Sequence, residues 1–313
     1  MTTAKTEPRI RITRRAVHGV LLLDKPLGLS SNDALQKAKW LLRAEKAGHT
    51  GTLDPLATGL LPLCFGAATK FSQVSLEADK TYEATLKLGQ TTTTGDMEGD
   101  VLETRPVEVD AAKIAAACQA FTGEIEQIPP MHSALKHEGK ALYEYARQGI
   151  EIERQARKVT IHSIQIMGGE GDELTIAVRC SKGTYIRTLA EDIGRMLGCG
   201  AHLSALRRTA SGPVRVEDAV TLDALAAMNE VEREALLHPP DSLLADWPAV
   251  QLAGEEAARF LNGLRRRIQA ADAPHVRVYE SRALLGSASI TAGELIPGRL
   301  LSPQEVEFLK EAS

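Results

Sequence analysis

The periodicity of this 313-residue sequence agrees with an α+β fold. Apolar and polar residues alternate from Thr81 to Leu88 and again from Glu173 to Cys180, as they do in half-buried strands. Residues 109–122 and 183–197 have the patterns of helices instead. Strands and helices are therefore both expected within the chain.

The expected elements follow one another in a definite order. They are a loose basic arm (1–16), a short buried strand (17–23), a helix (30–43), a strand (81–88), a turn leading to a second strand (91–101), a helix (109–122), a strand (173–180) and a helix (183–197). Ser30 to Asp33 offer the side-chain oxygens that cap a helix N-terminus. Gly123 and Gly198 are expected to end the two later helices, because glycine readily adopts the conformation that closes a helix.

Trp247-Pro248 marks an expected domain boundary, because an acidic, proline-containing stretch precedes it. Residues 17–246 would then form one domain and residues 247–313 a second, small one. The small domain is expected to hold a short helix over about 254–262, a basic triplet and three short strands.

The composition is that of an ordinary globular protein, with 43% apolar residues. No segment is apolar for long enough to cross a membrane. The N-terminus is basic and lacks the apolar core of a secretory signal, so the cytoplasm is the expected location. The four cysteines show no zinc spacing, and most of them are expected to be buried, small apolar residues. We expect neither a metal nor a cofactor.

The net charge of −4 conceals a segregation of charge along the chain. Residues 1–50 carry ten Lys and Arg against four Asp and Glu, and residues 131–215 carry thirteen against nine. Residues 51–130 and 216–250 each have an excess of seven acidic residues. A localised basic face is enough to dock nucleic-acid phosphates, although such asymmetry also arises by chance.

The most informative segment runs from Gly48 to Gly59 and reads Gly-His-Thr-Gly-Thr-Leu-Asp-Pro-Leu-Ala-Thr-Gly. Its glycines let the backbone take positive φ and let a ligand come close, while Pro55 keeps Asp54 out of helical geometry. A P-loop is excluded, because no Lys-Ser or Lys-Thr follows at the required spacing. Asp54 is therefore a candidate nucleophile or phosphate-side ligand, with a purely structural turn as the alternative.

Four segments together resemble the TruB-type tRNA pseudouridine synthases in their bacterial form. They are the Asp54 loop, a lysine-proline segment (Gly19 to Ser31), a tyrosine strand (Lys80 to Ala84) and an arginine segment (Arg179 to Leu189), in the order of the family. The resemblance implies a mixed, largely antiparallel sheet with flanking helices and an active cleft across its middle. It also implies a small, β-rich C-terminal domain related to the RNA-binding PUA domain.

The resemblance further implies that the chain isomerises the T-loop uridine of tRNA, conventionally position 55, after flipping the base out of its stack. Asp54 would be the nucleophile, at C1′ of the ribose or C6 of the uracil. Arg187 would keep it ionised through bidentate pairing, since burial alone would protonate it. Tyr82 would pack on the uracil and help to remove the C5 proton. Taken alone, Arg187 would be a surface residue and Tyr82 a core residue.

His49 and Asp96 have supporting roles with open alternatives. His49 would fill the gap left by the flipped base, or it is a neutral histidine bonded within its own loop. Asp96 would orient Tyr82 or Arg187, or it caps a turn.

Lys25 and Lys182 are expected to contact phosphates or to be structural. Leu206 would form part of the pocket wall, with Arg207 and Arg208 nearer the RNA backbone.

Residues 129–158 differ in character from their surroundings and resemble the family's insertion that clamps the T-arm. Basic and aromatic side chains alternate there, a combination that suits RNA; they are Lys136, His137, Lys140, Tyr143, Tyr145 and Arg147. The alternative is an amphipathic helix over 142–147 that packs on the domain.

The expected partner is tRNA alone, with no membrane, guide RNA or obligate protein partner, and the chain is expected to be a monomer. One rival is the guide-RNA-dependent relative of this family. A second is an RNA-binding or RNA-folding module whose catalysis is secondary. A third is a glycosidase using Asp54 with Asp96, but an aromatic content of 4% offers little for a sugar platform.

Overall fold

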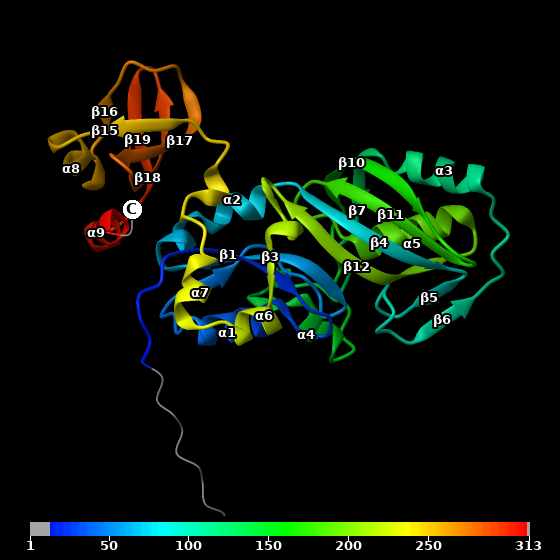
Figure 1. The fold of residues 1–313 in the computed structure, drawn as a ribbon. Helices are drawn as coiled ribbons and strands as arrows, with labels where there is room; N and C mark the ends of the chain where they lie inside the picture. Colours follow the sequence, from blue (N-terminus) through cyan, green and yellow to red (C-terminus); the bar gives the residue numbers. More distant parts are fainter. Residues whose placement is uncertain (1–12, 312–313) are drawn as a thin grey trace, which may run out of the picture.

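The computed structural model describes residues 13–311, so most of the expected basic arm (1–16) lies outside the described residues. A ten-stranded sheet crosses the body, and a five-stranded sheet forms a separate unit near the C-terminus (Figure 1). Helices flank the large sheet. The predicted α+β class, with a β-rich C-terminal domain, is confirmed.

The large sheet has the order β14-β1-β3-β12-β4-β11-β10-β7, with β2 paired to β3 and β13 paired to β12. Its strands are β1 (Gly19–Lys25), β2 (Ala47–His49), β3 (Ala57–Phe65), β4 (Lys80–Leu88), β7 (Gly123–Gln127), β10 (Arg157–Gly168), β11 (Glu173–Cys180), β12 (Ala201–Ser211), β13 (Val214–Arg215) and β14 (Val220–Thr221). The pairs β1·β14 and β3·β12 are parallel, and the other pairs are antiparallel. The sheet is thus mixed and largely antiparallel, as predicted.

The middle of the sheet joins three strands that lie far apart in the sequence. On β12, Leu206 pairs with Ala57 of β3, and Arg208 lies between Gly59 of β3 and Tyr82 of β4. Gly59 has φ +97°, and a Cβ there would lie 2.3 Å from the carbonyl oxygen of Arg208. Only glycine therefore lets β3 approach β12 this closely.

The helices that precede the C-terminal unit are mostly short. They are α1 (Ser31–Leu41), η1 (Gly66–Phe71), α2 (Ser72–Glu77), α3 (Ala111–Ala120), α4 (Leu142–Ala146), α5 (Ile186–Leu197), η2 (Val216–Asp218), α6 (Leu222–Ala227), α7 (Glu230–Ala235) and η3 (Ser242–Leu244). Ser30 caps α1 by accepting from the Asp33 N–H, and Gly198 closes α5 in the left-handed conformation with φ +84°. Gly123 does not close α3 directly, since the helix ends earlier and Gly123 begins β7.

Two hydrophobic cores meet at the middle of the large sheet. One is built mainly from β4, β11 and α5, and the other mainly from β1, β3 and α1. Tyr82 and Leu206 pack against both cores. These two predicted pocket residues therefore lie at the junction of the two halves of the domain.

Several segments contact the C-terminal unit, and η1 is one of them. Its strands are β15 (Ala249–Leu252), β16 (Arg266–Arg267), β17 (Ala273–Glu280), β18 (Ala283–Thr291) and β19 (Glu294–Leu300), and its helices are α8 (Glu255–Leu261) and α9 (Pro303–Glu311). Phe71 of η1 belongs to the C-terminal core. Lys70 donates to the Leu300 carbonyl at 2.9 Å and pairs with Glu305 at 2.6 Å.

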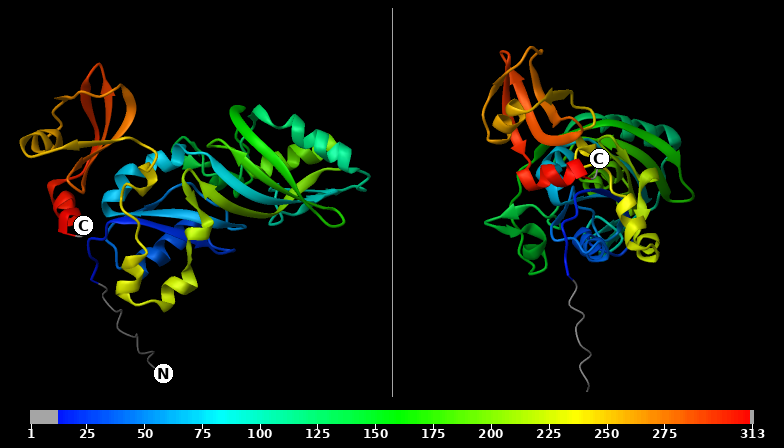
Figure 2. Two further views of the ribbon diagram at one scale, coloured as in Figure 1. Left: turned by 45° about the horizontal axis from the view of Figure 1, so that its top comes forward. Right: turned by 60° about the vertical axis from the view of Figure 1, so that its left-hand side comes forward.

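Residues 129–158 form an irregular segment that stands away from the body (Figure 2, right). It contains the small hairpin of β8 (Lys136–His137) and β9 (Lys140–Ala141), followed by α4. Leu142 is buried while Tyr143 is 38% exposed, so the helix of the alternative interpretation exists but leaves aromatic surface free. A second hairpin, β5 (Gln90–Thr92) and β6 (Val101–Thr104), precedes it in sequence.

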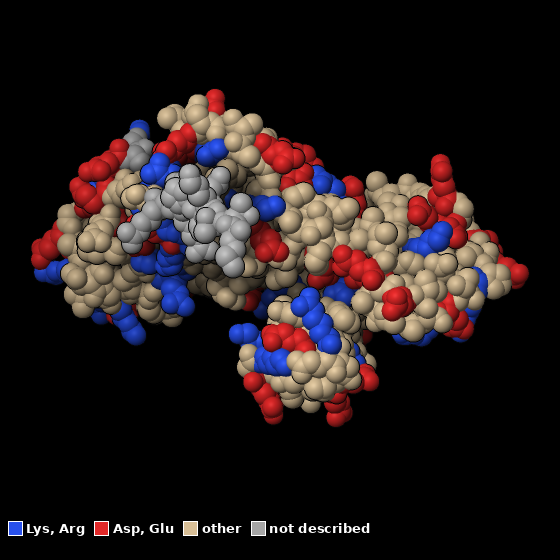
Figure 3. All heavy atoms as spheres, turned by 90° about the horizontal axis from the view of Figure 1, so that it is seen from below, with Lys and Arg blue, Asp and Glu red and all other residues tan. Residues whose placement is uncertain are grey.

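The side of the molecule that Figure 3 shows is not purely basic. Seen from below, Lys and Arg side chains lie among Asp and Glu side chains (Figure 3). Within residues 13–311, no helix is long and apolar enough to cross a membrane.

Candidate active site

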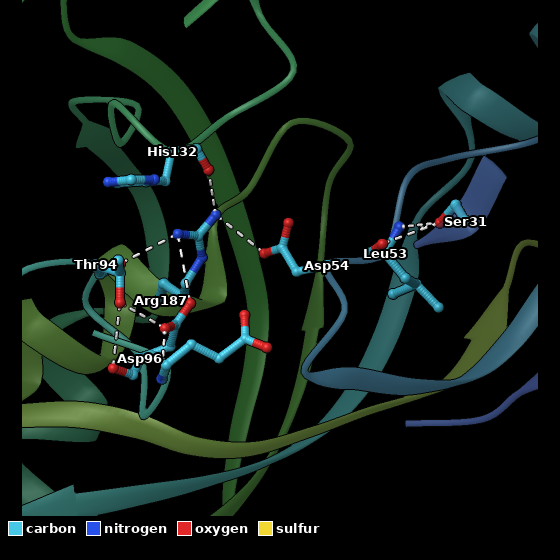
Figure 4. A network of polar contacts seen from close by, with 8 residues as sticks. Ser31, Leu53, Asp54, Thr94, Asp96, His132 and Arg187 are labelled. Carbon is cyan, nitrogen blue, oxygen red and sulfur yellow. Dashed lines mark hydrogen bonds and ion pairs between the residues drawn. The ribbon is translucent and has the colours of Figure 1, made fainter. Parts of the chain in front are cut away.

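Asp54 lies on a loop that is fastened on both sides. The Ser31 hydroxyl, at the start of α1, donates to the Leu53 carbonyl at 3.0 Å and accepts from the Leu53 N–H at 2.7 Å (Figure 4). On the far side, the Gly28 N–H donates to the Pro55 carbonyl at 2.8 Å. Hydrogen bonds therefore fix the backbone of Leu53 and Pro55, the residues on either side of Asp54.

Arg187, on the first turn of α5, points at Asp54 and joins it to a second acid. Its Nη2 lies 3.0 Å from Asp54 Oδ2, and its Nη1 lies 3.6 Å from Asp96 Oδ2. The same guanidinium donates to the carbonyls of Thr94 at 3.1 Å and His132 at 2.6 Å (Figure 4). One buried cation thus links the Asp54 loop, the β5–β6 hairpin and the insertion.

The pairing of Arg187 with Asp54 differs from the expected bidentate geometry. A single nitrogen, Nη2, meets a single carboxylate oxygen, because the other terminal nitrogen, Nη1, is directed to Asp96 and to the Thr94 carbonyl. The arginine is surrounded on three sides, and its side chain is only 5% exposed. The alternative expectation, that Arg187 is a surface residue, is therefore wrong.

Opposing effects set the charge state of Asp54. Burial raises the pKa of its carboxyl, the charge and hydrogen bond of Arg187 lower it, and the nearby Asp96 raises it again. The net direction is upward. The side chain nevertheless remains 39% exposed, so a ligand can reach an oxygen that Arg187 leaves free.

Asp96 combines the two roles that the sequence left open. Its side chain is 4% exposed and accepts from the Thr94 hydroxyl at 2.6 Å and the Glu98 N–H at 3.1 Å, which caps the turn. It also lies opposite Arg187. It is directed at Arg187 rather than at Tyr82, and so deeply placed a carboxylate does not form an open acid pair with Asp54.

Tyr82 lies on β4 with its ring between the two cores. Burial raises the pKa of its hydroxyl, while the Arg208 guanidinium lowers it by charge and by hydrogen bonding. Leu206 packs beside it on the neighbouring strand. The expected position of Arg208 near an RNA backbone is wrong, because this side chain is 1% exposed.

Lys25 is buried, which favours the structural role over the phosphate contact. Its ammonium group donates to the carbonyls of Pro26 at 2.9 Å, Leu29 at 2.6 Å and Pro55 at 3.5 Å. Burial lowers the pKa of Lys25 to about 8. The residue ties the turn after β1 to the residue that follows Asp54.

His49 and Lys182 lie farther from the carboxylate pair. His49 ends β2, and its Nδ1 is buried without a hydrogen-bond partner among the described residues. Burial lowers the pKa of this imidazole, so it is held neutral. Lys182 is half exposed and pairs with Glu77.

Several residues of the site gave no signal in the sequence. Ser31 was expected only as a capping candidate, and the backbone carbonyls of Thr94 and His132 have no sequence signature. Most of the cysteines were predicted to be buried, and all four are buried and free. Among residues 13–311, no group of three or more His, Cys, Asp or Glu is arranged to hold a metal ion. Independence from metals and cofactors stays a prediction.

An RNA-modifying class is defined by comparison with known proteins. The profile described as TruB family pseudouridylate synthase (N terminal domain) matches residues 39–186. Profiles for the tRNA pseudouridylate synthase B C-terminal domain and for pseudouridine synthase II TruB, C-terminal, match residues 187–245 and 248–301.

Similar full-length proteins and structures agree with these profiles. Proteins named tRNA pseudouridine synthase B from Burkholderia lata and Verminephrobacter eiseniae are both 59% identical, and the matches cover 96% and 95% of this chain and 95% and 93% of theirs. A Cbf5-Nop10-Gar1 complex contains a chain with 28% identity and a TM-score of 0.71, over 92% of this chain and 86% of that one. A chain of an archaeal box H/ACA sRNP Nop10-Cbf5 complex has 25% identity and a TM-score of 0.68, and the match covers 96% of this chain and 90% of that one.

The chain belongs to the TruB family of pseudouridine synthases. It is therefore an isomerase.

Proposed function

We propose that the chain is a stand-alone tRNA pseudouridine synthase that isomerises the T-loop uridine, conventionally position 55. The observation that carries the proposal is the 3.0 Å ion pair of Arg187 with Asp54, whose side chain remains 39% exposed. The names of the relatives at 59% identity support tRNA as the substrate.

The reaction breaks the N1–C1′ bond of uridine, turns the base over and joins C5 to C1′. The C5 proton is lost and N1 gains one, so the reaction needs no donor group and no redox cofactor. Asp54 acts as the nucleophile, at C1′ or at C6. Arg187 opposes the effect of burial and maintains the ionised fraction of Asp54 that can attack.

Two aromatic side chains handle the base. The target uridine is stacked in a folded RNA loop and must be extruded before it can react. His49, which is held neutral, fills the space that the base leaves. Tyr82 packs its ring on the uracil, and its oxygen, ionised to the phenolate, accepts the C5 proton late in the reaction.

The insertion of residues 129–158 clamps the T-arm. Lys140 lies over the Tyr145 ring at 4.7 Å and Arg147 over the Tyr143 ring at 5.2 Å, so cations and aromatic faces are presented together. Lys182 adds a phosphate contact, and residues 247–313 form a second, PUA-like RNA-binding domain beside the catalytic domain of residues 17–246. The chain works as a monomer in the cytoplasm.

The guide-dependent alternative deserves a direct test, because the similar solved structures are box H/ACA complexes. The purified chain is incubated alone, with chelator, on an unmodified tRNA transcript, and the modified nucleotide is mapped. Conversion at the T-loop position is expected. Tight tRNA binding without conversion would favour the guide-dependent enzyme or the RNA-folding module.

Asp54→Asn is the control in the same assay. It keeps the shape of the side chain but removes the nucleophile, so turnover should vanish while tRNA binding and the melting temperature stay nearly unchanged. A rate near that of the wild type would refute the nucleophile assignment.

A further inference from the structure

Arg208 is the largest of the fully buried side chains, and the mechanism above gives it no task. It is 1% exposed, and no ion pair among residues 13–311 involves it. A guanidinium stays charged in proteins, and burying a charge without an opposite charge is costly. Packing alone therefore does not explain an arginine at this position.

The contacts of Arg208 lie beneath the loop of the nucleophile. Its Nε donates to the Leu60 carbonyl of β3 at 2.7 Å, and its Nη2 donates to the Gly51 carbonyl at 3.2 Å. A Cβ at Gly51, where φ is +79°, would lie 3.2 Å from Nη1. The guanidinium is thus pressed against the backbone three residues before Asp54.

The same side chain lies directly opposite Tyr82. The two residues are partners in the antiparallel register of β4 and β12, so their side chains share one face of the sheet. Arg208 accordingly acts on the Tyr82 hydroxyl by charge and by hydrogen bonding. One rigid, planar group therefore contacts both the Asp54 loop and the tyrosine.

We propose that Arg208 is a positioning residue for Tyr82, which fixes the phenol relative to the Asp54 loop and leaves an uncompensated positive charge where a phenolate would form. The inference rests on the proposed function, in which the Tyr82 oxygen accepts the C5 proton. A guanidinium fixed beside Tyr82 stabilises the phenol oxygen when it is ionised, because opposite charges then lie close together. The backbone carbonyls of Leu60 and Gly51 hold the guanidinium in place.

The direct test measures the tyrosine without RNA. The chain is labelled with fluorotyrosine, and the resonance of Tyr82 among the five tyrosines is assigned with Tyr82→Phe. In Arg208→Gln, which keeps a donor for one carbonyl but loses the charge, the Tyr82 resonance should titrate about one pH unit or more higher than in the wild type. An unshifted titration would overturn the proposal.

Lys80→Met is the matched control. Lys80 is also a buried cation, 6% exposed and near Gly51, but its ammonium group donates to the carbonyls of Ser75 and Leu76. Removing this ammonium group should not change the pH at which the Tyr82 resonance titrates. An equal shift in this control would assign the effect to general loss of buried charge.

The kinetic test asks whether Arg208 acts through Tyr82. Arg208→Gln should lower kcat about tenfold or more, with little change in KM, and should raise the isotope effect of [5-²H]uridine tRNA above that of the wild type. In the Tyr82→Phe background the same change should add little. If the losses in kcat from the two substitutions were additive, Arg208 would have a structural role that is independent of Tyr82.

Two further measurements separate the possible failures. If melting shows that Arg208→Gln is unfolded, Arg208→Lys is titrated instead, since one ammonium group cannot serve two carbonyls and the phenol together; its Tyr82 resonance should also move to higher pH, and no movement would overturn the proposal. Conversion of tRNA by the wild type is recorded in parallel. A wild type without activity but with the titration shift would refute the proposed function and leave the Arg208–Tyr82 contact standing.

Discussion

Arg187 meets four acceptors at once, two carboxylates and two backbone carbonyls, on three separate segments. A planar guanidinium has enough donors in a fixed arrangement for this task, whereas a lysine has one ammonium group. Arg187 therefore holds Asp54 while its own position is fixed by Asp96 and the two carbonyls. The ion pair is one contact in a network, not an isolated pair.

The pH dependence of catalysis follows from this network. Only ionised Asp54 can attack, and burial raises the pKa of its carboxyl, so kcat/KM should fall with decreasing pH at a pKa above that of an ordinary aspartate. Arg187→Gln removes the effect that lowers this pKa, so the acidic limb should move to higher pH. Arg187→Lys keeps a charge and should move it less while still losing much activity. The profile of kcat/KM against pH, which reports the free enzyme, checks both variants. An acidic limb unchanged in Arg187→Gln would contradict the coupling.

Lys25 offers a test between a phosphate contact and a structural tie. Lys25→Met leaves the carbonyls of Pro26, Leu29 and Pro55 without their donor, and each unsatisfied buried group costs about 1–3 kcal/mol. We expect a lower free energy of unfolding and a lower kcat, with tRNA affinity nearly unchanged. Denaturant unfolding and binding titrations measure these quantities. A loss of tRNA affinity alone, with stability and kcat unchanged, would favour the phosphate contact instead.

At the scale of residues, the sequence identified the charged residues that stand in recognisable motifs. It did not predict how deeply a residue is buried. Asp54, Arg187 and Asp96 were predicted as neighbours and the structure brings them together. Arg208 was expected nearer the RNA backbone but is buried. Its depth is hard to predict, since arginine is almost never fully buried and strand alternation does not distinguish two covered faces. The single-oxygen pairing of Arg187 depends on backbone carbonyls that no pattern reveals.

At the scale of elements, the insertion has exposed cations beside aromatic rings. Lys136→Gln and Arg147→Gln, made together, should weaken tRNA binding across sequences and reduce the salt slope of log K by about two, if each contacts one phosphate. Lys113→Gln on α3 is the control, since this exposed lysine lies outside the insertion. Binding titrations at several salt concentrations measure the slope. A slope equal to that of the wild type would remove these residues from the interface.

Elements with a clear period were predicted within a few residues. The strand expected at 81–88 is observed as Lys80–Leu88, and that expected at 173–180 as Glu173–Cys180. The strand expected at 17–23 lies two residues later, because a run that is apolar throughout has no alternation to fix its ends. The long strands β3, β10 and β12 were not predicted. β14 and β16 were missed as well, since each has two residues and exists only through pairing with a distant strand.

For the whole molecule, the two domains share a core, to which Ala67, Phe71 and Leu244 contribute buried side chains from outside residues 247–313. Phe71 of η1 is 1% exposed and packs in the C-terminal cluster. Phe71→Ala should cost about 3–5 kcal/mol, and it should separate the unfolding of the two domains. Calorimetry should then show two transitions where the wild type has one. A single transition in the variant, at an unchanged temperature, would contradict this coupling.

The neighbour relation of β3 and β12 also has a consequence during protein synthesis. Arg208 bonds to Leu60 across 148 positions of sequence, so the strand that completes the cleft leaves the ribosome on the order of ten seconds after the strand that it joins. Until then the nascent chain has Asp54 but lacks Arg187 and β12, the central partner of β3 and β4. Closure of so long a loop is slow. Catalytic competence thus arises late in translation, as one of the last events of folding in this domain.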